Sequence, residues 1–103
     1  MIFSYKLLLS EKFDNPGDIL NGLKQGVLPK SCFLLCINNA SSNIMDIYYS
    51  EEFQKPYVNA DDLLIIAICK DKRDAKDKCA ELIGDYLAKN KSFDGFKDNF
   101  IAK

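Results

Sequence analysis

Four cysteines carry the most reactive side chains of this sequence, because a thiolate can bind a metal, form a disulfide or act as a nucleophile. Cys32 and Cys36 fall in an apolar run that predicts a strand, where they would share a face about 13 Å apart, too far for a disulfide. A four-thiolate zinc site normally needs two closely spaced cysteine pairs, and the chain has one such pair and no histidine. Cys69 ends an apolar segment and Cys79 lies in an amphipathic one. This spacing predicts four reduced, buried structural thiols, with no metal and no cofactor.

Residues 61–87, DDLLIIAICKDKRDAKDKCAELIGDYL, predict a buried strand that leads directly into an amphipathic helix. Many nucleotide-binding proteins hold phosphate at such a junction, but they need glycines there so that backbone N–H groups can approach the anion. The junction here is Cys69-Lys70-Asp71-Lys72 and contains no glycine. Asp71 would also place a carboxylate where the anion should bind, and it can cap the helix itself. We therefore interpret this segment as scaffold and not as a phosphate site.

Acid–base catalysis has few candidate residues in a chain without histidine. Asp61 and Asp62 are neighbours, and neighbouring side chains of an extended chain point to opposite faces, so they are better interpreted as turn residues than as a catalytic pair. Tyr48, Tyr57 and Lys70 could line a ligand pocket with their polar ends at its mouth. The other interpretation of the tyrosines is packing at the edge of a sheet. If these residues do line a pocket, the protein would be a small enzyme or a ligand-binding regulator, and we keep this as the alternative to a non-enzymatic function.

The C-terminal segment, SFDGFKDNFIAK, has an apolar side that requires burial. Phe93, Phe96 and Phe100 are spaced i, i+3 and i+7, so a helical conformation would place them on one face, with Ser92 at the N-cap position. We predict that these three phenylalanines form an attachment surface. The surface on which they dock is either the protein's own sheet and long helix or a partner chain, and the sequence leaves both open.

Hydrophobic periodicity predicts the elements of the first part of the chain. Residues 2–10 alternate between two faces, as in a half-buried strand. Asn15, Pro16 and Asp18 then favour the start of a short helix, because they offer an N-cap, a proline in the first turn and a carboxylate near the positive end of the helix dipole. Gly26 provides the stop signal of this helix.

Two strands, a central strand and a long helix are predicted in the remainder. Residues 31–39 and 43–50 are joined by a polar loop and predict a hairpin. Residues 50–57 fit either a helical turn or a continued strand. Residues 63–68 are apolar on both faces, as expected of a central strand that is covered on both sides or buried at an oligomer interface. The helix capped by Asp71 carries a single apolar stripe, which consists of Ala75, Cys79, Leu82, Ile83, Tyr86 and Leu87.

These elements predict one α+β domain that spans residues 1–103. The expected order is β-α-β-β-β-α, with a mostly antiparallel sheet of about four strands and two helices packed on one of its faces, in a ferredoxin-like arrangement or a variant of it. Such a fold hosts enzymes, regulators and assembly modules, so it does not by itself predict a function.

Composition and charge narrow the classes of function. The net charge is −1 and Arg73 is the only arginine, which argues against nucleic acid as a partner. The longest apolar run, residues 63–69, is far shorter than the roughly 20 residues that cross a bilayer. The N-terminal stretch suits a strand better than a signal peptide, so we expect a cytoplasmic protein without membrane association. The sequence favours a non-enzymatic binding or assembly module that acts through a protein–protein surface, on another protein or in a homo-oligomer.

Overall fold

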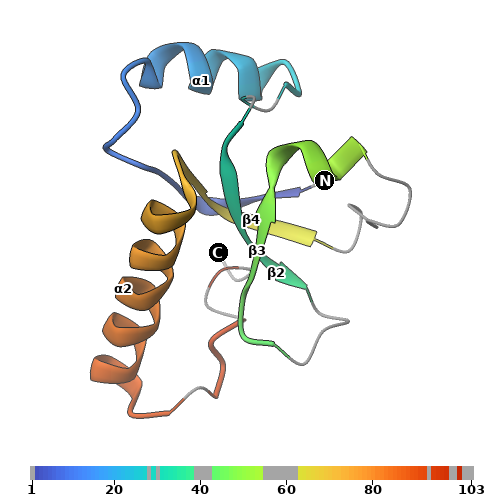
Figure 1. Ribbon diagram of the computed structural model, residues 1–103. Helices are drawn as coiled ribbons and strands as arrows, with labels where there is room; N and C mark the ends of the chain where they lie inside the picture. Colours follow the sequence, from blue (N-terminus) through green and yellow to red (C-terminus); the bar gives the residue numbers. More distant parts are fainter. Residues whose placement is uncertain are drawn as a thin grey trace.

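The computed structural model describes residues 2–27, 29, 31–38, 43–54, 63–92, 94–97 and 100. Its elements, in chain order, are β1 (Ile2–Leu9), α1 (Pro16–Lys24), β2 (Phe33–Asn38), β3 (Asp46–Tyr49), the 3₁₀ helix η1 (Ser50–Gln54), β4 (Leu63–Cys69) and α2 (Lys72–Asn90). The four strands form one sheet with the spatial order β1-β4-β2-β3 (Figure 1).

The sheet is mixed, which corrects the expectation of a mostly antiparallel sheet. Strand β2 is antiparallel to both β3 and β4, whereas β1 and β4 run parallel. Strands β3 and β4 therefore point in the same direction and do not form a hairpin with each other. Strand β4 then lies between β1 and β2, the position that best buries a strand whose two faces are both apolar. The ferredoxin-like assignment is not confirmed by this arrangement.

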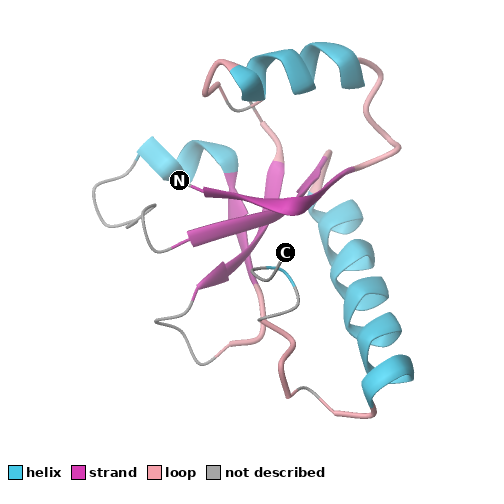
Figure 2. Ribbon diagram, turned by 180° about the vertical axis from the view of Figure 1, so that it is seen from behind, coloured by secondary structure: helices cyan, strands magenta, loops and turns pink. Residues whose placement is uncertain are grey.

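The two faces of the sheet carry separate apolar clusters. The α2-side cluster consists of Leu35, Ile37, Ile66, Ala67, Cys69, Ala75, Phe96 and Phe100, and Cys79, Leu82, Ile83 and Tyr86 of α2 pack against it. The opposite cluster consists of Cys32, Leu34, Cys36, Leu63, Ile65 and Ile68, and Leu23 of α1 packs against it. In both ribbon views α1 lies beyond the end of the strands and α2 runs beside the sheet (Figure 2). The expectation that both helices share one face is therefore wrong, because a sheet that is apolar on both sides needs cover on both.

A β-bulge interrupts the alternation of β4. Leu35 pairs with Ala67 and Cys36 pairs with Ile65, so Ile66 is an extra residue in β4. As a consequence, Ile66 and Ala67 both belong to the α2-side cluster, although they are consecutive. Bulges of this kind bend a strand and redirect its side chains. Here the bulge adds apolar surface beneath α2.

Hydrogen bonds at the ends of the elements account for their boundaries. The Asp74 backbone N–H donates to the Asp71 carboxylate at 2.8 Å, so Asp71 is the N-cap of α2 as predicted. Residues 50–54 form a 3₁₀ helix, and residues 55–57 lie outside the described residues. The start of η1 is attached to β2, because the Ser50 N–H donates to the Cys32 carbonyl at 2.8 Å and the Cys32 N–H donates to Ser50 Oγ at 3.2 Å.

Candidate functional site

A groove lies between β1 and the second half of α2, and we call it the α2 groove. Its volume is about 290 Å³. Leu8, Leu82, Phe96 and Phe100 form its apolar part, and Asp85, Tyr86, Lys89 and Asn90 contribute polar groups from α2. The helix residues recur every three or four positions, so one face of α2 borders the groove. Leu8, on the β1 side of the groove, is 37% exposed.

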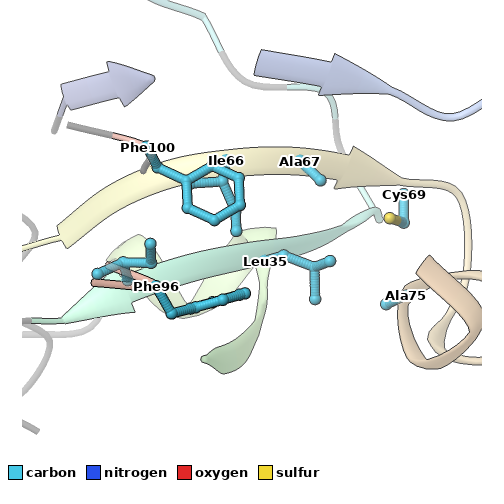
Figure 3. Packing of buried hydrophobic residues seen from close by; sticks show 8 residues of the cluster. Leu35, Ile66, Ala67, Cys69, Ala75, Phe96 and Phe100 are labelled. Carbon is cyan, nitrogen blue, oxygen red and sulfur yellow. The ribbon is translucent and has the colours of Figure 1, made fainter. Parts of the chain in front are cut away.

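Aromatic rings of the C-terminal segment form one end of the α2-side cluster. Phe96 is 2% and Phe100 5% exposed, and they lie at the opposite end of the cluster from Cys69 and Ala75 (Figure 3). The Phe96 ring stands edge-on to Tyr86 with a centroid distance of 5.1 Å, and its centroid is 5.3 Å from that of Phe100. Such aromatic pairs add about 0.5–1.5 kcal/mol beyond the burial of their area.

Three polar contacts hold the same segment in place. The Ser4 hydroxyl of β1 donates to the Phe100 carbonyl at 2.9 Å, and the Tyr86 hydroxyl donates to the Asp94 carbonyl. The Lys97 ammonium donates to the Asn38 carbonyl at the end of β2, at 3.1 Å. The described residues of this segment, 94–97 and 100, are therefore docked on the chain's own sheet and on α2.

The structure describes two of the three phenylalanines of the predicted attachment surface. Phe96 and Phe100 are brought together in the α2-side cluster, while Phe93 lies outside the described residues. Contact of these phenylalanines with a partner chain stays a prediction. The structure also shows that the buried rings support the neighbouring groove, which has exposed apolar surface at Leu8.

A second hollow, which we call the α1 pocket, lies beside α1 and has a volume of about 450 Å³. Phe13, Ile19, Val27 and Pro29 line it with apolar side chains, and Asn15, Asp18, Ser31 and Lys70 contribute polar groups. Lys70 was one of the residues expected at a ligand pocket, and the structure places it here. Its ammonium lies 3.7 Å from a carboxylate oxygen of Asp14.

The tyrosine expected beside Lys70 lies elsewhere. Tyr48 packs against the opposite cluster, and the described lining of the α1 pocket does not include it. Burial raises the pKa of Tyr48, and Asp46 raises it further, whereas a hydrogen bond with Asn38 lowers it. Tyr57 and the pair Asp61 and Asp62 lie outside the described residues. Tyr48 and Lys70 are therefore not brought together into one pocket.

Burial of the cysteines is confirmed for three of the four. Cys32, Cys36 and Cys69 are each 0% exposed and Cys79 is half-buried, and all four are free thiols. Burial raises the pKa of Cys36 and of Cys69 to about 12, and nearby carboxylates, Asp46 and Asp74 respectively, add to these shifts. Thiols with raised pKa values hold little thiolate near neutral pH and are poor nucleophiles. Within the described part of the chain, no group of three or more potential ligands could hold a metal ion.

Thiol labelling should separate the four cysteines. In the native protein, we expect a thiol-reactive probe to modify Cys79 first, because it is the most exposed cysteine, and to modify the other three only as fast as the chain opens. Time-resolved mass spectrometry after peptide digestion measures the order. In denaturant, all four should react at similar rates, which controls for intrinsic reactivity. Fast native labelling of Cys36 or Cys69 would contradict the structural role of these thiols.

Sequence reasoning named Lys70, Phe96 and Phe100 but missed the other residues that border the two hollows, because these residues belong to distant segments. Leu8 of β1 and Leu82 of α2 line one hollow, and Phe13 and Lys70 line the other. One signal was present, since Leu7, Leu8 and Leu9 are consecutive and an alternating strand must then present leucine on both faces. Leu7 and Leu9 do pack against the opposite cluster, and Leu8 borders the α2 groove.

Among the residues that the structure describes, no helix is both long enough and apolar enough to cross a membrane. Comparisons with protein-family models, with curated proteins and with solved structures find no match for this chain.

Proposed function

We propose that the protein is a non-enzymatic binding or assembly module that acts through a protein–protein surface, and that its partner is a second copy of the same chain. The interface consists of the β1 edge of the sheet and the α2 groove beside it. The two sheets continue into one another, and side chains from the second copy cover the groove. We expect this assembly in the cytoplasm, without nucleic acid.

The length and composition of the edge strand β1 support this proposal. In the sheet formed by the described residues, the two outer strands are β1, with eight residues, and β3, with four. Unpaired N–H and C=O groups of an outer strand recruit other strands, so proteins usually keep such strands short or charged. Strand β3 is short and begins with Asp46, whereas β1, IFSYKLLL, has Lys6 as its only charged residue. Strand β1 is therefore the edge that gains most from a partner.

The α2 groove gives side chains of an added strand a place to bind. Peptides that extend a sheet gain affinity from backbone hydrogen bonds and specificity from pockets that accept alternate side chains. Leu8 is 37% exposed and lies beside the buried Phe100. Covering this apolar surface contributes roughly 25 cal/mol for each Å² that is removed from water.

A second copy is a suitable partner because the pairing can be symmetric. Closed two-fold dimers are the commonest oligomers, and in them the same patch meets itself. A two-fold axis perpendicular to the sheet would pair β1 antiparallel with β1 of the second copy and would place the two α2 grooves on the same face of the joined sheet.

Sedimentation equilibrium tests the proposal with two matched variants. Leu8→Lys places a charge at the β1 edge, and Ile47→Lys places the same charge at the β3 edge, where the exposed fraction of the side chain is 36% instead of 37%. We expect a wild-type dimer, at least about tenfold weaker dimerisation of Leu8→Lys and little change for Ile47→Lys, since a charge in a buried interface costs more than about 1.4 kcal/mol. Urea unfolding of both variants checks that the fold is kept.

Two other results would contradict the proposed homodimer or its interface. A wild-type chain that stays monomeric at all accessible concentrations overturns the homodimer. Selection of extended peptides from a displayed library, with the same two variants as controls, then tests whether the groove binds another protein. Dissociation by Ile47→Lys and not by Leu8→Lys overturns the assignment of the interface to β1.

A further inference from the structure

We propose that the α1 pocket binds a small molecule that carries one carboxylate on an apolar body. This site is separate from the proposed interface, because it lies beside α1 and not beside α2. Its volume of about 450 Å³ is within the range of about 300–1,000 Å³ that is typical of ligand pockets.

The apolar wall of the pocket is incompletely covered. Ile19 is 7% exposed, but Val27, which lines the same pocket, is 58% exposed. Phe13 is half-buried and packs against the opposite cluster, which connects the pocket wall to the core. A ligand with an aliphatic or aromatic body would remove the exposed surface of Val27 from water, and this burial is the main source of affinity that the pocket offers.

Lys70 supplies the charge that selects a carboxylate. Its backbone is fixed, because its N–H donates to the Asp74 carboxylate at 2.9 Å, while its side chain is 47% exposed at the pocket. The Asp14 carboxylate lies 3.7 Å from the Lys70 ammonium, so a carboxylate can reach the ammonium at this place. Asp14 is 95% exposed, and such surface ion pairs are weak because water and salt screen them. A ligand carboxylate can therefore displace Asp14.

The remaining polar groups argue against a more highly charged anion. Among the described residues at this pocket, a phosphate dianion would meet the carboxylates of Asp18 and Asp14 beside the ammonium of Lys70. A monocarboxylate meets less repulsion. The Asn15 amide also lines the pocket and makes no side-chain capping bond to the described part of α1, so it can donate to a ligand oxygen.

Because Asp14 and the ligand would compete for the Lys70 ammonium, two variants should change ligand binding in opposite directions. The probe is octanoate, titrated into isotope-labelled protein and followed by backbone amide shifts. Lys70→Gln should weaken saturable octanoate binding by about fivefold, since one ion pair is lost. Asp14→Asn should strengthen binding, because it removes the competing carboxylate. Both side chains are substantially exposed, so neither change should unfold the chain.

Matched controls test whether a change in octanoate binding is specific to Lys70 and Asp14 or follows from any change of net charge. Lys72→Gln and Asp77→Asn change the same charges at exposed positions of α2 and should leave octanoate binding unchanged. Octanol, which has the same apolar body without the carboxylate, should bind less tightly than octanoate. Absence of saturable shifts at Phe13, Ile19 and Val27, equal affinity of wild type and Lys70→Gln, or stronger binding of inorganic phosphate than of octanoate would each overturn the proposal.

Discussion

Replacing Phe96 by alanine should lower the free energy of unfolding by about 3–5 kcal/mol, the usual cost of truncating a fully buried phenylalanine. The ring is 2% exposed, and its edge-on contact with Tyr86 is lost together with its contact with Phe100. Because folded domains are stable by only about 5–15 kcal/mol, this single change should remove a large fraction of the total stability. Urea unfolding followed by circular dichroism measures the loss.

The matched control is Leu20→Ala on α1. Leu20 is 47% exposed, so its truncation should cost well under half as much as that of Phe96. Truncation of the chain after Lys91 removes Phe96 and Phe100 together and should destabilise the protein further. If Phe96→Ala left stability unchanged and weakened association instead, the phenylalanine would belong to a partner interface, and its place in the chain's own core would be contradicted.

Local patterns predicted the parts of the fold that depend on neighbouring residues. The Asp71 cap, the apolar face of α2 at Cys79, Leu82 and Tyr86, and the burial of Cys32 and Cys36 all follow from spacing along the chain. The pairing of β2 with β3 follows from the polar loop between two apolar runs.

The arrangement of the sheet could not be predicted in the same way, because it depends on contacts between distant segments. In the run LLIIAIC every residue is apolar, so alternation cannot show which side chains share a face or that Ile66 is a bulge. Local sequence rules also cannot predict the parallel pairing of β1 with β4, because they favour hairpins between consecutive strands. Both hollows were missed for this reason, since each is formed by segments that only the fold brings together.

As the pH rises above 9, the free energy of unfolding of this protein should fall more steeply than that of an equivalent chain without buried cysteines. Burial raises the pKa of Cys36 and of Cys69 from 9.0 to about 12, so the folded state keeps two protons that the unfolded chain releases above pH 9. A group whose pKa is higher in the folded state contributes stability below its unfolded pKa and loses that contribution as the pH rises toward its folded pKa. Each thiol should therefore remove about 1.4 kcal/mol of stability per pH unit in the window from 9 to 12.

The slope of stability against pH measures this effect, independently of the absolute stability of each variant. We expect Cys36→Ala to reduce the alkaline slope by about 1.4 kcal/mol per pH unit, because all other titratable groups remain in both proteins and cancel in the comparison. Cys79→Ala is the control, since this thiol is only half-buried and should change the slope less. Urea unfolding under reducing conditions, below and above pH 9, provides the data. Equal alkaline slopes for the wild type and Cys36→Ala would show that water reaches the Cys36 thiolate, and would contradict its burial in the opposite cluster with Leu34 and Ile65.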